Sequence, residues 1–184
     1  MGVEIERKFT VKKLPENLDK YKMHIIEQGY LNVVPAIRVR REDNHYYMTY
    51  KVKKDFLAAN AEGSDGIGKT EYNMPLDAES YEHLVKKSDG NVIRKKRYLI
   101  PINSDAFTVE YKKAHPEVQK LADEGGIKIE LDVFEAPFDG RILAEVEFPN
   151  EDMARNYNPA DWFDEDVTDD VRYSNAHMSR ENVN

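Results

Sequence analysis

Six segments of the chain alternate charged and apolar side chains two residues apart, a pattern that is typical of strands in a β-sheet. In an extended chain, side chains at i and i+2 lie on the same face. In VEIERKF (3–9), Glu4, Glu6 and Lys8 therefore share one face, and most of the apolar side chains occupy the other. The other segments are AIRVRRED (36–43), YYMTYKVKK (46–54), NVIRKKRYLIP (91–101), IKIELDVF (127–134) and ILAEVEF (142–148).

Each of these strands tends to carry charges of one sign on its polar face. The same-face pairs are Arg38 and Arg40, Lys51 and Lys53, Lys95 and Arg97, Glu130 and Asp132, and Glu145 and Glu147. A solvated outer face is the simpler interpretation of any one strand, but such a face usually mixes signs. Two amphipathic segments, 77–88 and 150–157, are predicted helices that would cover the apolar face. We therefore predict a sheet that is apolar outside and charged inside, and that closes into a barrel without free edges.

Like charges gathered inside a barrel need partners that neutralise them. The basic strands favour a polyanion, and the acidic strands favour a divalent cation, because hard cations such as Mg²⁺ and Mn²⁺ bind carboxylate oxygens. A polyphosphate or nucleotide bound with one or two Mg²⁺ or Mn²⁺ ions would satisfy both sets of charges. The charge pattern therefore predicts a small-molecule partner of this kind.

Composition narrows the remaining classes of protein. The 184 residues are predicted to form one domain (1–184) that is large enough for a hydrophobic core. A net charge of −8 argues against a nucleic-acid partner. The absence of cysteine excludes disulfides and a thiol nucleophile, and it agrees with a cytoplasmic location. We find neither a signal-peptide pattern nor a membrane-spanning apolar run, and therefore expect no membrane contact. The oligomeric state is not set by the sequence, and a homodimer stays open.

Residues 63–70, GSDGIGKT, match the phosphate-loop pattern G-x-x-x-x-G-K-[ST]. A phosphate loop connects a buried strand to a helix whose N-terminus holds the phosphates. The preceding DFLAANAE (55–62) has no buried-strand character, and the residues after Thr70 alternate with strand period before Pro75. We therefore interpret the match as a loop between two strands rather than a nucleotide cradle.

A set of motifs occurs in one order along most of the chain, beginning with the ExExK pattern of residues 4–8. The others are EQGYLN (27–32), IRVR (37–40), YMTYK (47–51), KKRY (95–98), ELDVF (130–134), AEVEF (144–148) and WFDEDVTDDVRYSN (162–175). In these motifs and their order the chain resembles the CYTH superfamily, the triphosphate tunnel metalloenzymes. The resemblance implies a mainly β (α+β) fold, namely a closed eight-stranded antiparallel β-barrel tunnel with a charged interior and short helices packed outside.

The resemblance also implies roles for individual residues. Lys8 and Tyr30 would be catalytic and would assist the attacking water or the departing oxygen. The residues that would bind phosphate are Arg38, Arg40, Lys51, Lys95, Arg97 and Arg172, to which the charge pattern adds Lys53. The residues that would bind metal are Glu4, Glu6, Glu130, Asp132, Glu145 and Glu147, with Glu71 as an additional tunnel carboxylate.

The activity that the resemblance implies is metal-dependent hydrolysis of a triphosphate. The expected substrate is inorganic tripolyphosphate, which would yield pyrophosphate and phosphate, and nucleoside triphosphates are further substrates. Two alternatives stay open. One is an adenylate cyclase of the class IV type, which makes cyclic AMP and pyrophosphate from ATP, and the other is a non-catalytic polyphosphate-binding module.

The chain departs from the family pattern in two places. Family members often carry Arg-x-Glu-x-Glu after the loop, whereas residues 69–73 here are Lys-Thr-Glu-Tyr-Asn, so Asn73 replaces a carboxylate. Residues 103–126 look like an insertion, in which FTVEYKK (107–113) would form an extra strand and PEVQKLADE (116–124) a short helix. If that strand belonged to the barrel, Glu110 would face the interior in place of Glu130 and Asp132.

Overall fold

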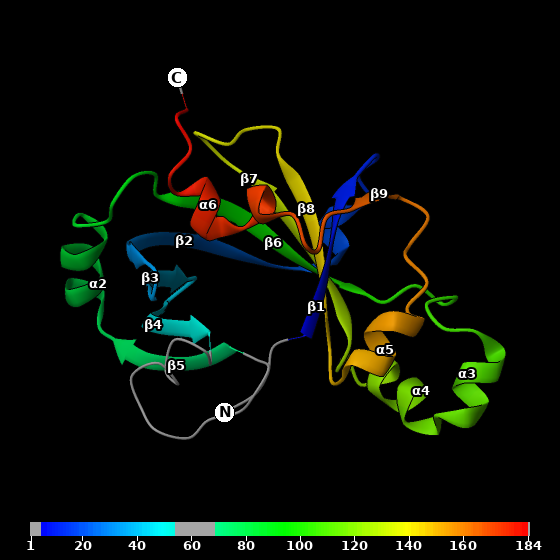
Figure 1. Cartoon of the computed structure of the whole chain (residues 1–184). Helices are drawn as coiled ribbons and strands as arrows, with labels where there is room; N and C mark the ends of the chain where they lie inside the picture. The colour runs from blue at the N-terminus through cyan, green and yellow to red at the C-terminus, as the bar shows by residue number, and fades with distance from the viewer. Residues whose placement is uncertain (1–4, 54–68, 184) are drawn as a thin grey trace, which may run out of the picture.

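The central feature of the protein is one antiparallel sheet in the order β5-β4-β3-β2-β6-β7-β8-β1-β9 (Figure 1). The computed structural model describes residues 5–53 and 69–183. The strands are β1 (Ile5–Val11), β2 (Lys22–Val33), β3 (Ala36–Glu42), β4 (His45–Lys53), β5 (Lys69–Leu76), β6 (Ile93–Pro101), β7 (Lys128–Phe134), β8 (Ile142–Phe148) and β9 (Phe163–Asp166). Because β1 pairs with both β8 and β9, the first strand of the chain lies between the last two strands in the sheet.

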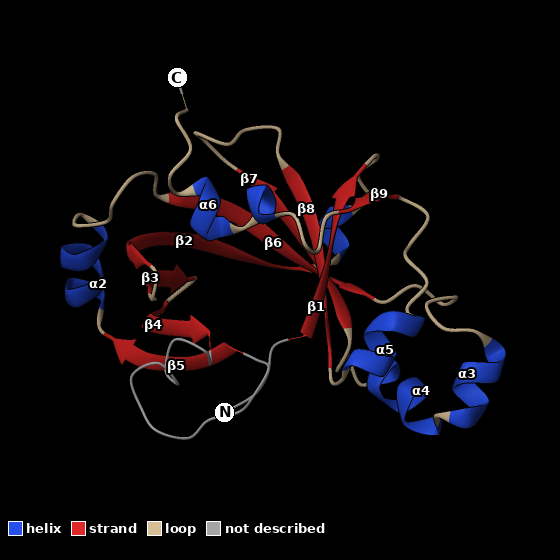
Figure 2. Cartoon of the chain, in the orientation of Figure 1, coloured by secondary structure: helices blue, strands red, loops and turns tan. Residues whose placement is uncertain are grey.

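Short helices lie outside the sheet, as predicted, and Figure 2 shows several of them gathered at one side. The helices are α2 (Ala78–Val85), α3 (Val109–Ala114), α4 (Pro116–Asp123), α5 (Glu151–Asn156) and α6 (Asn175–Met178), with 3-10 turns η1 (Leu18–Lys20) and η2 (Val171–Tyr173). The predicted helices at 77–88 and 150–157 form as α2 and α5, and the side chains of Asp77 and Asn150 cap them. In the described part of the chain, no helix is long and apolar enough to cross a membrane.

The predicted closed eight-stranded barrel is wrong, because the sheet has nine strands and is not closed into a barrel. The reason lies at β1, whose second edge pairs with β9 through Phe9 opposite Asp166 and Val11 opposite Phe163. Within residues 5–53 and 69–183, no strand pairs with the outer edge of β5. The sheet instead curls strongly, so that β3, β4 and β5 come round to an open concave side (Figure 1).

The predicted apolar outer face is confirmed, because the main hydrophobic core lies between the convex face of the sheet and the helices. Phe9, Leu131 and Val146 from β1, β7 and β8 are buried there, together with Val118 of α4 and Met153 of α5. The acidic residues of these strands point to the other face, as the period of two predicts. Arg7 of β1 is an exception, because it shares the convex face with Phe9 and its guanidinium lies 5.0 Å from the centre of that ring.

The insertion at 103–126 contains the two helices α3 and α4, with turns beside them, and no strand, so the predicted extra strand at FTVEYKK is wrong. The hydroxyl of Thr108 accepts a hydrogen bond from the backbone N–H of Tyr111 at 3.1 Å and starts α3. The ring of Tyr111 stacks on Phe107 and on His115, with centroids 5.4 and 4.3 Å apart. Glu110 is exposed on α3 and does not face the interior of the sheet, whereas the predicted helix at 116–124 forms as α4.

The phosphate-loop match lies mostly outside the described residues, which resume at Lys69. Lys69 and Thr70, its last two residues, begin strand β5, which continues to Leu76. The helix that a phosphate loop requires after this motif is therefore replaced by a strand. This agrees with the interpretation of the match as a connection between two strands.

An apolar cluster closes one end of the concave face. Tyr30, Ile93 and Leu143 are buried there together with Met178 of the C-terminal helix α6. The segment is held in place by the backbone N–H of Asn91, which donates to the carbonyl of Ser179 at 2.7 Å. The concave face is consequently apolar at this end and charged along the rest.

The backbone of Gly90 packs closely against the C-terminal segment, and a substitution there tests how much this contact contributes to stability. Gly90 has φ +73°, and a Cβ built there would lie 2.0 Å from the carbonyl oxygen of Ser179, whereas Gly125 has φ +70° with open space around it. We expect Gly90→Ala to lower the unfolding free energy by roughly 2–4 kcal/mol, because strain and overpacking add. Gly125→Ala should cost about 1 kcal/mol, from strain alone. Urea denaturation of both variants checks this, and equal losses would contradict the close approach.

Candidate active site

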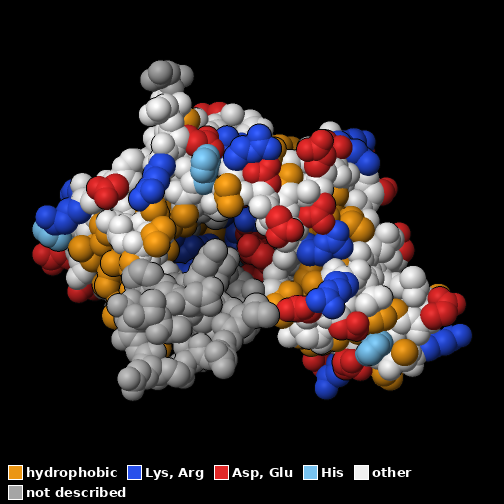
Figure 3. Space-filling view, in the orientation of Figure 1, with side chains coloured by type: hydrophobic (Ala, Val, Ile, Leu, Met, Phe, Trp, Pro, Cys, Tyr) orange, Lys and Arg blue, Asp and Glu red, His pale blue; other side chains and the backbone are white. Residues whose placement is uncertain are grey.

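A cavity of about 1330 Å³ occupies the concave face, and most of the predicted site residues line it. Figure 3 shows the hollow at the centre of one face of the molecule, with basic and acidic side chains beside each other. The predicted residues that line the cavity are Glu6, Lys8, Tyr30, Arg38, Arg40, Lys51, Glu71, Lys95, Arg97, Glu145 and Glu147. Folding therefore brings together residues from strands at both ends of the sheet.

The remaining predicted residues lie elsewhere. Glu4 and the side chain of Lys53 are outside the described residues. Arg172 is not among the residues that line the cavity, and its exposed guanidinium binds Asp170 at 2.5 Å. This correction follows from the turn η2, where Asp170 is the capping residue and holds the side chain of Arg172 on the surface. Glu130 lines a smaller adjoining cavity of about 340 Å³.

Arg97 is the centre of a buried ion cluster that joins β6, β7 and β8. Its Nε and Nη2 atoms donate to the two carboxylate oxygens of Asp132 at 2.7 and 2.6 Å. Nη2 also donates to Glu145 at 2.8 Å, and Nη1 pairs with Glu130. Lys95, from the same strand, lies with its Nζ 2.5 Å from Asp132. Five of the predicted site residues thus bind one another.

The cluster changes the expected roles of two carboxylates. Asp132 is 1% exposed and is held by two cations at once. Metal binding by Asp132 and Glu130 stays a prediction, and the contacts favour a role in positioning Lys95 and Arg97. Burial, followed by the charge of Arg97, lowers the pKa of Lys95 to about 8. For Arg97 burial acts in the same sense, but Asp132, Glu145 and Glu130 outweigh it and raise its pKa.

Lys8 sits beside this cluster and is bound to the same carboxylate. Its Nζ lies 2.9 Å from Glu145 and 3.8 Å from Glu6, and the residue is 7% exposed. Burial disfavours the ammonium, but the charges of Glu145 and Glu6 outweigh burial and raise the pKa of Lys8. Lys8 is therefore a fixed cation at neutral pH.

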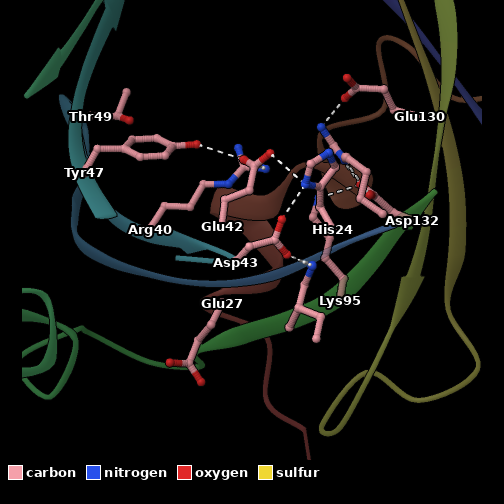
Figure 4. A network of polar contacts seen from close by, with 12 residues as sticks. His24, Glu27, Arg40, Glu42, Asp43, Tyr47, Thr49, Lys95, Glu130 and Asp132 are labelled. Atoms are coloured by element: carbon pink, nitrogen blue, oxygen red, sulfur yellow. Dashed lines mark hydrogen bonds and ion pairs between the residues drawn. The ribbon is translucent and has the colours of Figure 1, made fainter. Parts of the chain in front are cut away.

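Two arginines on β3 form the opposite, basic wall of the cavity. The Nε atoms of Arg38 and Arg40 are buried, and neither has a hydrogen-bond partner among the described residues. Each guanidinium makes a contact through Nη2, Arg38 with Thr49 at 3.2 Å and Arg40 with Glu42 at 3.3 Å. Figure 4 shows Arg40 reaching from β3 toward the group around Lys95. Burial and then the positive charges of Arg38 and Arg97 lower the pKa of Arg40. The same gathered positive charges make this wall attractive to an anion.

Sequence reasoning missed Thr49 and underestimated Asn73, which support this wall. The hydroxyl of Thr49, 1% exposed, donates to Asn73 at 2.6 Å, and the Asn73 amide donates to Glu71 at 3.1 Å. Lys51 lies 3.6 Å from Glu71. The sequence contained a signal for both residues, because each lies two positions from a predicted site residue and therefore on the same face of its strand. Asn73 thus joins Thr49 to Glu71 through its amide.

The carboxylates of β1 and β8 are suited by their chemistry to a divalent cation. Glu6 and Glu147 are direct partners in the pairing of the two strands, and like charges in such positions repel. Both line the cavity, as does Glu145, and hard cations prefer oxygen ligands of this type. Among residues 5–53 and 69–183, no three acidic or histidine side chains already converge as a metal site. The donor set fits Mg²⁺ or Mn²⁺ in kind, without being assembled in advance.

The CYTH domain model matches residues 2–172, and the chain therefore belongs to the CYTH domain family. An inorganic triphosphatase from Nitrosomonas europaea is 33% identical over 181 residues, which cover 96% of each chain. An inorganic triphosphatase from Acetivibrio thermocellus is 27% identical over 187 residues, covering 97% of this chain and 94% of the other. The crystal structure of an inorganic triphosphatase superposes with a TM-score of 0.66 at 28% identity, covering 100% of this chain and 99% of that one.

The low pKa of Lys95 predicts how stability depends on pH. Its folded value of about 8 lies below the ordinary 10.5. Between these values the unfolded chain binds more protons than the folded protein, so the unfolding free energy should rise with pH. Between these two pH values, the unfolding free energy of wild type should rise by up to about 3 kcal/mol relative to that of Lys95→Met. Above the upper value the difference between the two proteins should stay constant.

The measurement is urea denaturation of both proteins from pH 7 to 11, with Lys96→Met as the matched control. Lys96 is on the same strand, but its side chain is 45% exposed and pairs with Glu135 at the surface. A difference between wild type and Lys95→Met that stayed constant with pH would contradict the shifted pKa.

Proposed function

We propose that this protein is a metal-dependent triphosphatase that converts inorganic tripolyphosphate to pyrophosphate and phosphate, and that also accepts nucleoside triphosphates. The observation that carries the proposal is the basic wall of Arg38 and Arg40, which lies across a cavity from a wall of carboxylates. Within the described part of the chain, the buried Nε donors of both arginines have no hydrogen-bond partner. Two bacterial relatives of the chain are inorganic triphosphatases, which supports inorganic tripolyphosphate as the proposed substrate.

A linear polyanion suits this arrangement of charges. Guanidinium groups bind phosphate oxygens through paired N–H donors, and in a cavity with little water these contacts are strong. We assign the grip on the substrate to Arg38, Arg40 and Lys51, all of which line the cavity. Arg97 and Lys95 would add positive charge from the adjoining wall while Asp132 holds them in position.

Hydrolysis itself needs positioning and charge neutralisation more than covalent help. The oxygen of a water molecule bonds to the terminal phosphorus, the anhydride P–O bond breaks, and the water's proton passes to a cavity carboxylate. The ammonium of Lys8 would stabilise the departing pyrophosphate oxygen, with the hydroxyl of Tyr30 beside it in the same cavity. A divalent cation held by Glu6, Glu145 and Glu147, with Glu4 as a further ligand, would supply neutralisation of the phosphate charge.

Removing one carboxylate tests the metal assignment. Glu6→Gln and Glu147→Gln preserve size but delete an anionic ligand, so turnover at fixed Mg²⁺ or Mn²⁺ should fall roughly 10²-fold or more. Raising the metal concentration should restore part of the activity. Tripolyphosphate binding without metal should hold or tighten, because repulsion between carboxylate and phosphate falls.

The matched control for both variants is Glu165→Gln, an exposed residue of β9 outside the cavity. The melting temperatures of the two cavity variants should hold or rise, since Glu6 and Glu147 repel each other without metal. Turnover equal to wild type in both metals would remove these residues from the metal site.

One incubation distinguishes the three candidate activities. The protein is given ATP and, separately, tripolyphosphate, each with Mg²⁺ or Mn²⁺, and the products are separated. We expect orthophosphate from tripolyphosphate, and a slower release from ATP. Cyclic AMP with pyrophosphate would show a cyclase instead, and tight binding without any product would show a binding module.

A further inference from the structure

Gln28 of β2 is a buried amide that has no role in the mechanism above. It is 1% exposed, and both Nε2 and Oε1 lack a hydrogen-bond partner among the described residues. The side chain lines the large cavity. A buried donor or acceptor without a partner costs free energy, and this side chain carries one of each.

The neighbours of Gln28 are residues of the proposed site. Its partner on β3 is Arg40, and side chains in such positions have Cβ atoms about 4.5–5.5 Å apart. Its partner on β6 is Ile93, so Lys95, two residues along β6, lies diagonally beside it. Tyr30 follows two residues later on the same face of β2. The amide therefore stands between a catalytic candidate and the basic wall.

Two neighbours of Gln28 also contain buried N–H donors that require a hydrogen-bond acceptor. The Nε of Arg40 and the Nε of Arg38 are buried, and neither has a partner in residues 5–53 and 69–183. All three residues line the same cavity, each of the three side chains contains an N–H donor without a partner among the described residues, and of the three only Gln28 adds an acceptor. An anion alone would satisfy the donors and leave Oε1 unpaired. A phosphoryl group with a water molecule beside it would satisfy all of them.

We infer that Gln28 is a further catalytic residue of the proposed triphosphatase. Its Nε2 donates to a phosphoryl oxygen of the substrate, and its Oε1 accepts a hydrogen bond from the attacking water. The amide thus orients the water toward the phosphorus next to the oxygens that Arg40 holds. This inference rests on the proposed function and names a residue that the charge pattern of the strands cannot reveal.

The amide is better suited to this position than a carboxylate would be. A glutamate at position 28 would pair with Arg40 or Lys95 and lower the positive potential of the wall. It would also repel the phosphate in a cavity where charges are weakly screened. A glutamine can orient the water and the substrate without placing a negative charge beside Arg40 and Lys95.

The test compares Gln28→Met with the matched control Gln119→Met. Gln119 is exposed on α4, where its amide donates to Asp123 at 2.8 Å. For tripolyphosphate with Mg²⁺ we expect Gln28→Met to lower kcat about 10²-fold, with a smaller change in KM. Its melting temperature should hold or rise, because the variant removes two unpartnered polar atoms. Gln119→Met should keep wild-type kinetics.

Gln28→Glu provides a second readout that does not depend on turnover. Calorimetric titration with tripolyphosphate in the presence of a chelator should show affinity at least 10-fold weaker than wild type. Gln28→Asn, which keeps the amide on a shorter side chain, should recover part of the kcat lost in Gln28→Met.

The outcomes separate this inference from the proposed function. If wild type hydrolyses tripolyphosphate while Gln28→Met stays within 3-fold in kcat and Gln28→Glu binds as wild type does, the role of Gln28 is overturned and the function stands. A lower melting temperature with unchanged kcat would likewise show a structural amide. If wild type does not hydrolyse tripolyphosphate, the proposed function fails, and the catalytic role of Gln28 fails with it.

Discussion

Charges buried inside this sheet must be paired, and that constraint determines how its strands are arranged. An unpaired charge in a protein interior costs several kcal/mol, whereas a pair with good hydrogen bonds is tolerated. Arg97 lies directly opposite Asp132, and Lys8 lies directly opposite Glu145. A slip of one residue would turn these charges to the apolar convex face. The ion cluster therefore sets the register of β1, β6, β7 and β8 while the convex core provides most of the burial.

The two walls of the cavity differ in how far their charges are satisfied. On the wall formed by β6, β7 and β8, Arg97 and Lys95 are held by carboxylates. On β3, Arg38 and Arg40 keep buried Nε donors that have no partner among the residues that the structure describes. Such donors are costly in the free protein, and a bound anion removes that cost. A site whose donors are already in place needs little reorganisation when the charge of the substrate arrives.

The apolar end of the concave face strengthens these electrostatic effects. Tyr30, Ile93 and Met178 form a buried apolar cluster at this end of the sheet. In such surroundings a charge interacts more strongly than it does in bulk water. The C-terminal helix α6, distant in sequence from β2 and β3, supplies part of this cover (Figure 1). The site is thus completed by a segment that carries none of the charged residues assigned to it.

The period of two in the sequence by itself determined which face of each strand is charged, because side-chain direction in a strand is local. The sequence also determined the helices α2 and α5, because their capping residues and apolar stripes lie close together along the chain. Only the tertiary structure decided that Asp132 binds Lys95 and Arg97, because strand order brings together residues more than 30 positions apart. The open sheet depends on β9 taking the free edge of β1. The importance of Gln28 depends on neighbours from three strands, and no local pattern of a single strand contains that information.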